Sequence, residues 1–247
     1  MTQDWIVPDW PAPANVHALV TTRGGGASVA PYASLNLGDH VGDDPAAVAA
    51  NRRMLQASLP AEPVWLKQVH GRGIAAANHA TGVPEADGSV ARKPGVVCAV
   101  LTADCLPVLL CDRAGTAVAA AHAGWRGLAD GVVEAAVQAM AVEAGELLAW
   151  LGPAIGPRAF EVGGEVRQIF MEHDPAAELA FVPSANAGKW LADIYLLARQ
   201  RLARIGVSAV YGGDYCTYSD AERFYSYRRD GVTGRMASLI WVDQEKR

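Results

Sequence analysis

The sequence predicts an α/β protein built as a single-domain mixed β-sheet sandwich with flanking helices. Apolar runs of strand length interleave with amphipathic helical patterns along the 247 residues, but the two do not alternate strictly. Hydrophobic residues make up 51% of the chain and charged residues 19%, which indicates a well-buried core. No repeat, low-complexity tract or flexible linker divides the sequence, so we expect one domain over residues 1–247.

The N-terminal half predicts five strands and one helix. Residues 16–22 follow the pattern of a strand and lead into a glycine-rich loop. Asp44 and Pro45 predict the start of a helix that ends near Leu59, because Asp caps helices and Pro suits the first turn. The other predicted strands cover residues 63–70, 96–102, 106–111 and 116–121.

The C-terminal half predicts three helices and three strands. The first helix follows Gly127 and ends near Glu143, and the second extends from about Glu161 to Glu172. The third helix ends at Gly206 and has apolar residues at helical spacing, namely Leu191, Ile194, Ala198, Leu202 and Ile205. Strands are predicted at residues 147–151, near Val207 and at residues 237–242.

The composition argues against nucleic-acid-binding, membrane and exported proteins. The formal net charge is -5, and no basic stripe marks a nucleic-acid-binding surface. The most apolar stretch, residues 96–111, is too short and too interrupted to span a bilayer. The first residues lack the pattern of a signal peptide, so we expect the four cysteines to be free thiols in a cytoplasmic protein.

Three potential metal ligands occupy similar places along the chain. His70 ends one predicted strand, Cys105 follows a second, and His122 ends a third. Because ligands gather beyond the strand ends of open α/β sheets, we expect a metal site at these strand ends. Two imidazoles and one thiolate suit zinc, and three protein ligands leave a fourth position open for water or substrate.

A structural role is the competing interpretation for every His and Cys. A lone His or Cys more often fills space in the core or on the surface than binds a metal. We adopt that interpretation for the residues without matching neighbours, which are His17, His40, His79, His173, Cys98 and Cys111. For the three potential ligands, spacing alone leaves both interpretations open.

Several segments of the chain resemble the motifs of one protein family. They are residues 65–71 with Gln-Val-His-Gly, 102–110 with Ala-Asp-Cys, 120–128 with Ala-His-Ala-Gly-Trp, 150–156, 160–163 and 224–230. The family is that of the YfiH-like laccase-domain proteins, variously labelled polyphenol oxidase, peptidoglycan editing factor and purine nucleoside phosphorylase. The resemblance implies a metal site at His70, Cys105 and His122. It also implies phosphorolysis of adenosine, inosine, guanosine and methylthioadenosine, with adenosine deamination at the same site.

Phosphorolysis needs a group that holds phosphate, and a guanidinium group does so with two parallel hydrogen bonds. The candidates lie in glycine-rich or turn-like motifs and are Arg23, Arg126, Arg228 and Arg229. Arg228 and Arg229 are explained equally well as solvated surface charges. Tyr227, with Phe224 and Trp125, is a candidate for stacking on a purine, although packing is the commoner role of such aromatics.

The catalytic candidates are Cys105, His122 and Asp104. Deamination needs a nucleophilic water, and zinc lowers the pKa of a bound water to about 7. A carboxylate must then move the proton, and Asp104 is the nearest in sequence to a predicted ligand. Asp104 could equally orient or cap neighbouring groups. Cys216 also lies in a family-like motif, without an assigned role.

Three alternative functions remain open. Copper in the same site would indicate a phenol oxidase, but the chain has six histidines and no His-X-His pair for multicopper electron transfer. An amide hydrolase acting on a cell-wall precursor would use Cys105 as nucleophile, with His122 or His70 as base. The third is a non-enzymatic metal or nucleoside binder. We expect purine nucleosides and phosphate as ligands, no nucleic-acid or membrane partner, and a monomer or homodimer.

Overall fold

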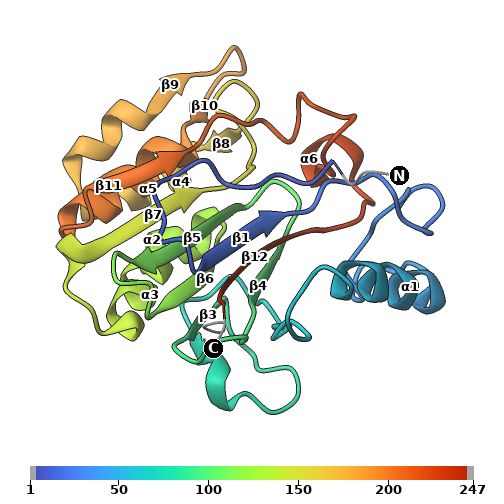
Figure 1. The fold of residues 1–247 in the computed structure, drawn as a ribbon. Coiled ribbons are helices and arrows are strands. Elements are labelled where there is room, and N and C mark those ends of the chain that lie inside the picture. Colours follow the sequence, from blue (N-terminus) through green and yellow to red (C-terminus); the bar gives the residue numbers. More distant parts are fainter. Residues whose placement is uncertain (1–3, 244–247) are drawn as a thin grey trace.

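Two β-sheets pack face to face at the centre of the protein, and helices cover their outer faces (Figure 1). The computed structural model describes residues 4–243. Its strands are β1 (Val16–Val20), β2 (Ile74–Ala76), β3 (Gly88–Ala91), β4 (Cys98–Thr102), β5 (Leu106–Asp112), β6 (Val118–Ala123), β7 (Leu147–Leu151), β8 (Glu161–Gly163), β9 (Phe181–Pro183), β10 (Lys189–Ala192), β11 (Ala209–Gly212) and β12 (Met236–Val242). Its α-helices are α1 (Pro45–Gln56), α2 (Trp125–Asp130), α3 (Val132–Met140), α4 (Gly164–His173), α5 (Ile194–Arg204) and α6 (Tyr227–Asp230). Short 3-10 helices cover Ala77–His79, Ala144–Glu146 and Pro175–Ala180.

The larger central sheet is mixed and has six strands in the order β11-β7-β5-β6-β3-β2. β11 is parallel to β7 and β2 is parallel to β3, while the other neighbours are antiparallel. Pairing of β5 with β6 places Pro107 opposite His122, and pairing of β3 with β6 places Gly88 opposite Ala121. This register brings the residues around positions 87, 105 and 122 to one end of the sheet.

The smaller central sheet is antiparallel and has the strand order β1-β12-β4. Figure 1 shows β1 and β12, from opposite ends of the chain, side by side. The outer face of this sheet carries Leu19, Leu101 and Leu239, and Leu55 of α1 packs on it together with Trp65. A third sheet, β8-β10-β9, is also antiparallel and contacts α4 at the side of the molecule (Figure 1).

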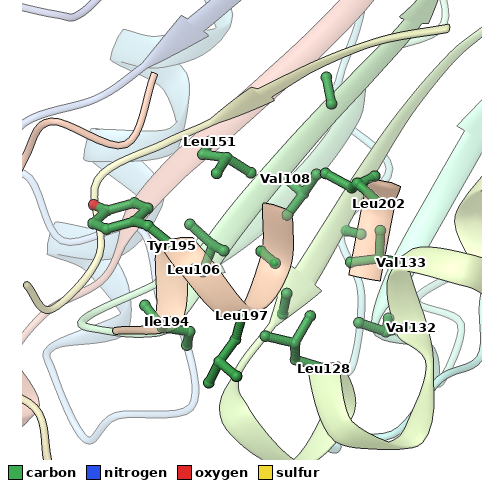
Figure 2. Packing of buried hydrophobic residues seen from close by; sticks show 14 of the residues in the cluster. Leu106, Val108, Leu128, Val132, Val133, Leu151, Ile194, Tyr195, Leu197 and Leu202 are labelled. Carbon is green, nitrogen blue, oxygen red and sulfur yellow. The ribbon is translucent and has the colours of Figure 1, made fainter. Parts of the chain in front are cut away.

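The side chains of β5 alternate between two cores. Leu106, Val108 and Leu110 face the core that the larger sheet forms with α2, α3 and α5, part of which Figure 2 shows. Leu109 and Cys111 face the smaller sheet. Successive strand residues point to opposite faces, and here both faces are covered. The apolar run is therefore continuous, as a strand buried on both sides requires.

These observations confirm the predicted mixed-sheet α/β sandwich with flanking helices. The strand predicted at residues 147–151 is present with these bounds, and those predicted at residues 16–22, 96–102, 106–111, 116–121 and 237–242 are present with shifted ends. The strand predicted near Val207 begins at Ala209. The helix that Asp44 was expected to cap begins at Pro45, and Asp44 accepts a hydrogen bond from the Ala46 amide. Among residues 4–243, no helix combines the length and the hydrophobicity that crossing a membrane requires.

Residues 63–70 do not form the predicted strand. The segment makes only isolated bridges, Val64 with Cys98 and Lys67 with Glu85. The side chain of Gln68 takes the place of a backbone ladder, because its amide both donates to and accepts from the backbone of Leu101. The segment is an extended connection attached to β4, and its consecutive apolar residues Trp65 and Leu66 are both buried.

The helix predicted after Gly127 is two helices. α2 begins earlier, at Trp125, and Gly131 separates it from α3 with a φ of 95°. Glycine adopts this left-handed conformation without the steric cost that other residues incur, so the break falls at Gly131. α3 ends at Met140, before the predicted end at Glu143.

Two other predicted helices begin later than expected. Glu161 starts strand β8, and α4 begins only at Gly164. Leu191 lies in β10, and Asp193 then caps α5 by accepting a hydrogen bond from the amide of Leu196. The strands β2, β3, β8, β9 and β10 have no counterpart in the predicted elements, because three or four residues are too few to show a periodicity.

Candidate metal centre

His70, Cys105 and His122 lie together at one end of the larger sheet. The potential ligand atoms of all three lie within 4.8 Å of one another, and no other such group of His, Cys, Asp or Glu occurs among residues 4–243. The Cys105 Sγ and His70 Nε2 atoms are 3.9 Å apart. The two imidazole rings meet edge to face, with their centroids 4.8 Å apart. The structure thus brings together the three residues that the sequence selected as ligands.

Each of the three residues reaches the cluster from a different segment. Cys105 lies in the turn between β4 and β5, and His122 is the last residue but one of β6. His70 does not end a strand, contrary to the prediction. It lies in the connection before β2, with a φ of 60°. Residues other than glycine rarely adopt a positive φ, so contacts around His70 must hold it there.

Asp87 holds both histidines in place. Its fully buried carboxylate accepts hydrogen bonds from the backbone amides of Val69, His70 and Gly71, at 3.1, 2.9 and 2.7 Å. It also bonds Nδ1 of His122 at 2.9 Å. Metal-binding histidines typically pair their second ring nitrogen with a carboxylate in this way, which leaves Nε2 of His122 for the cluster. Sequence reasoning did not select Asp87, because it stands before Gly-Ser-Val-Ala, a segment with no apolar run and no metal-ligand spacing.

The donor set fits a metal ion with three protein ligands. Zinc–sulfur and zinc–nitrogen bonds of about 2.3 and 2.1 Å allow up to about 4.4 Å between two donor atoms. The 3.9 Å between Cys105 Sγ and His70 Nε2 lies within this limit, and the three donor atoms, which lie within 4.8 Å of one another, would draw slightly closer around an ion. Thiolate and imidazole are donors for both zinc and copper. Two cavities adjoin the cluster and leave room for a further ligand.

Cys105 and His122 stabilise each other's charged forms. Burial opposes the thiolate, but the charge and hydrogen bonds of His122 and His70 lower the pKa of Cys105 to about 6. Burial likewise opposes a charged His122, but the Cys105 thiolate and the Asp87 carboxylate raise the pKa of His122 to about 9. Burial also disfavours the Asp87 carboxylate, yet hydrogen bonds from His122, Gly71 and Val69 hold the pKa of Asp87 below its usual value. A deprotonated thiol is the form that binds a metal.

Asp104 connects three segments next to the cluster. Its buried carboxylate accepts hydrogen bonds from Thr217 Oγ1 at 2.6 Å, Ser226 Oγ at 3.0 Å and the Arg228 amide at 2.7 Å. These bonds attach the β4–β5 turn to the 217 loop and to the start of α6. They favour the orienting role of Asp104 over the proton transfer that the sequence suggested.

A cavity of about 270 Å³ adjoins one part of the cluster. Besides His70, Cys105 and Tyr227, its lining includes the apolar residues Trp125, Ile155, Phe160 and Ile194 and the cations Arg126 and Arg228. The guanidinium carbon of Arg126 lies 4.4 Å from the Trp125 ring centroid, and that of Arg228 lies 5.8 Å from the Phe160 centroid. An apolar wall with a few convergent polar groups is typical of a site for a small flat molecule.

A second cavity of about 380 Å³ shares His70, Ala103, Cys105 and Tyr227 with the first. Its remaining lining is mostly polar and consists of His40, Gln68, Leu101, Thr102, His122 and Arg235. His40 was expected to be an ordinary loop residue, and Arg235 was not singled out at all. The cluster therefore lies where the two cavities meet, the first with an aromatic and aliphatic wall and two arginines, the second with a mostly polar lining and one arginine.

Two of the four candidate arginines line neither cavity. The guanidinium group of Arg23 donates to backbone carbonyl groups of two loops and lies over the ring of Tyr225. The group of Arg229 donates to three backbone carbonyl groups and pairs with Asp230. Both side chains hold loops together, so the structure does not bring them to the cluster as the sequence suggested.

The candidate aromatic residues divide in the same way. Trp125 and Tyr227 line the first cavity, and Tyr227 is 61% exposed. Phe224 is fully buried, and its ring packs edge to face on Tyr215. Phe224 is therefore a core residue. Cys216 is a free thiol that accepts a hydrogen bond from the Gly156 amide, away from the cluster lining.

Comparison with known proteins finds relatives over nearly the whole chain. The family model described as "Multi-copper polyphenol oxidoreductase laccase" matches residues 17–243. A purine nucleoside phosphorylase of Pseudomonas aeruginosa is 61% identical over 238 residues, which cover 96% of this chain and 98% of the relative. Purine nucleoside phosphorylase YfiH of Escherichia coli is 58% identical over 243 residues, with coverage of 96% and 98%. The crystal structure of a Neisseria meningitidis protein is similar with a TM-score of 0.94 and 55% identity, over 98% of this chain and 100% of that one.

Proposed function

The chain belongs to the multi-copper polyphenol oxidoreductase laccase family, and we propose that it is a zinc-dependent purine nucleoside phosphorylase that also deaminates adenosine. Its substrates are phosphate and adenosine, inosine, guanosine or methylthioadenosine. We further propose that the protein is a single domain and acts in the cytoplasm. The reducing conditions there suit its four free thiols.

One observation carries the proposal: the His70, Cys105 and His122 cluster lies between a cavity with an aromatic and aliphatic wall and a mostly polar cavity that contains Arg235. A phosphorylase must hold a flat apolar base and a phosphate dianion on either side of a ribose. The first cavity offers aromatic ring faces to a base, and the second offers Arg235 with no carboxylate in its lining to a phosphate. The names of relatives that are 58% and 61% identical over almost their full length support the same activity.

In phosphorolysis, the bond between ribose C1′ and the purine nitrogen breaks, and its electron pair leaves with the base, which gains a proton. A phosphate oxygen forms the new bond to C1′, and the proton that the hydrogen phosphate gives up balances the proton gained by the base. We assign the base to the first cavity, where Trp125 and Tyr227 offer ring faces for stacking. Arg126 and Arg228 can donate hydrogen bonds to the polar edge of the base there.

The chain's own residues position this chemistry. A zinc ion held by His70, Cys105 and His122 would supply a Lewis acid between the two cavities. Asp87 fixes the tautomer of His122 and the backbone at His70, so both rings keep their directions when substrate binds. Asp104 anchors the start of α6 and thereby holds Tyr227 and Arg228 at the first cavity.

The experiment is an assay of zinc-loaded protein with separation of the products. With inosine and phosphate we expect hypoxanthine and ribose 1-phosphate, and with adenosine we expect both adenine and inosine. Cys105→Ala should lose the bound zinc, about one ion per chain in the wild type, together with both activities. Cys98→Ala is the control, because Cys98 is a core residue outside the cluster and should leave zinc and both activities in place.

Two results would contradict the proposal. Release of no base from any purine nucleoside by zinc-loaded protein would exclude the phosphorylase activity. A normal zinc content in Cys105→Ala would exclude the assigned metal site, whatever the activity.

A cysteine amide hydrolase is the second candidate. The chain of contacts from Cys105 to His122 and from His122 to Asp87 favours it. Thiolate, imidazole and carboxylate form a nucleophile, a base and an orienting group in that arrangement. Zinc content separates the two candidates, because a zinc-bound thiolate is not a free nucleophile. Phenol oxidation has less support, since residues 4–243 hold only one group of metal ligands and multicopper electron transfer needs more.

A further inference from the structure

We propose that Arg235, assisted by His40, binds the phosphate substrate in the second cavity. The assignment deepens the proposed function and rests on it. Both residues line the cavity of about 380 Å³, and His122 and Cys105 of the cluster line it as well. Neither residue is among the arginines and aromatics that the sequence suggested for substrate binding.

The Arg235 side chain is held in position before any ligand arrives. Its backbone amide donates to Asn36 Oδ1 at 2.9 Å, and its Nη1 donates to the carbonyl oxygens of Thr233 and Gly234 at 2.9 and 3.0 Å. A Cβ atom at Gly38 would lie 2.8 Å from Arg235 Cγ, so the stem packs directly on the Gly38 backbone. A guanidinium group fixed in this way loses little conformational entropy when it binds an anion.

The other edge of the same guanidinium group is available to a ligand. No acceptor among the described residues receives a hydrogen bond from Nε or Nη2 of Arg235. Neither atom is among the fully buried polar atoms that lack a partner, so solvent in the cavity reaches them. Two adjacent N–H groups of a guanidinium match two oxygens of one phosphate.

The charges around the second cavity favour an anion. Arg235 is the cation of its lining, and no Asp or Glu lines it among the described residues. Burial and the charge of Arg235 lower the pKa of His40, so His40 would act as a neutral hydrogen-bond donor. Asp39 lies outside the lining, where its carboxylate pairs with Arg52 at 3.3 Å and approaches Nδ1 of His40 at 3.5 Å. The first cavity differs, since Asp104 is part of its lining together with Arg126 and Arg228. An anion therefore meets less repulsion in the second cavity.

The other arginines are less suited to phosphate. Arg23 and Arg229 use their guanidinium groups to hold loops together. Arg126 and Arg228 lie over the aromatic rings of the first cavity, where we assign the base. With the base in the first cavity and phosphate at Arg235, the ribose falls at the residues that both cavities share, beside Cys105 and His70.

The test measures phosphate binding directly and then phosphorolysis, both with zinc-loaded protein. By titration calorimetry, inorganic phosphate should bind Arg235→Gln at least about tenfold more weakly than wild type, because a charge-assisted two-pronged contact is lost. Arg235→Lys should fall between them, since it keeps the charge but not the fork. Arg53→Gln, on the exposed side of α1, is the matched control. Zinc content and circular dichroism verify that each variant is folded.

In the kinetic arm, Arg235→Gln should raise the KM for phosphate at least about tenfold, while adenosine deamination, which uses no phosphate, changes much less. A phosphate affinity and KM within about twofold of wild type would overturn the subsite and leave the phosphorylase function standing. Phosphate binding that depends on Arg235 in a wild-type protein that releases no base would support the subsite and overturn the function. Inosine 5′-monophosphate serves as a second ligand. If its binding depends on Arg235 and that of inorganic phosphate does not, the assignment to inorganic phosphate is wrong.

Discussion

Cys105 differs from the two core cysteines in the charge that surrounds it. The imidazoles of His122 and His70 lower the pKa of Cys105 to about 6 against the effect of burial. Burial raises the pKa of Cys98 and of Cys111 to about 12. The same residue type is therefore a ready thiolate in the cluster and an inert thiol in the core.

This contrast predicts a pH-dependent alkylation pattern in metal-free protein. The rate of Cys105 modification by iodoacetamide should rise as pH increases through about 6 and then level off, because only the thiolate reacts. Peptide mapping by mass spectrometry follows each cysteine separately, and Cys98 and Cys111 should stay unmodified. His122→Ala should move the midpoint to higher pH, since it removes a stabilising positive charge. A wild-type midpoint at the ordinary thiol value of about 8.5 would contradict the expectation.

The pairing of β3, β5 and β6 assembles most of the site. β5 and β6 place Cys105 near His122, and β3 and β6 place Asp87 beside His122, whose backbone amide donates to the Asp87 carbonyl at 2.6 Å. The Asp87 carboxylate then accepts hydrogen bonds from the backbone of residues 69–71, a connection that is not part of any sheet. Asp87 thus joins an irregular segment to a rigid strand, and His70 depends on it for its position.

Asp87→Asn should weaken both the fold and the metal site. We expect the free energy of unfolding to fall by about 3 kcal/mol, since a buried charge network loses one partner. Zinc affinity should fall about 10- to 100-fold, because the amide no longer orients His122 and the connection. Chemical denaturation and competition with a zinc chelator measure the two effects.

Asp112→Asn is the matched control for this prediction. Asp112 is also buried and accepts local hydrogen bonds, from Thr116 and Ala117, but it lies far along β5 from the cluster. Its replacement should lower stability without changing zinc affinity. Equal loss of zinc affinity in both variants would show that Asp87 acts only through general stability.

In the whole molecule, the three ligands meet only when the sheets have formed. His70 and Cys105 are separated by 35 residues in sequence, and no short motif brings the three together. The unfolded chain therefore brings these donor atoms together much less well than the folded chain. Metal binding of this kind stabilises the native state by mass action.

Removal of zinc should accordingly lower the melting temperature. At a free zinc concentration 1,000 times the dissociation constant, the stabilisation is about 4 kcal/mol, which corresponds to roughly 10 °C in Tm for a chain of this size. Calorimetry of wild-type protein before and after treatment with a chelator measures the difference. Cys105→Ala should melt at the same temperature in both conditions. A wild-type Tm that is insensitive to the chelator would contradict a zinc site in this protein.

The sequence by itself determined the properties that depend on local pattern and side-chain chemistry. Continuous apolar runs marked the buried strands β4 and β5, and Asp44 with Pro45 marked the start of α1. His70, Cys105 and His122 were identifiable because few residue types bind zinc. The motifs around them also indicated the family, whose model matches residues 17–243.

Only the tertiary structure decided which polar residues complete the site, because hydrogen bonds between distant segments leave no periodic trace in sequence. Asp87 acts on His122, 35 residues away, and Asn36 holds the backbone of Arg235 across 199 residues. Arg23 and Arg229 look like ligand-binding arginines in sequence, yet carbonyl groups brought close by folding occupy their donors. A side chain's type shows what it can bind, whereas the packing of the chain determines which partners lie within its reach.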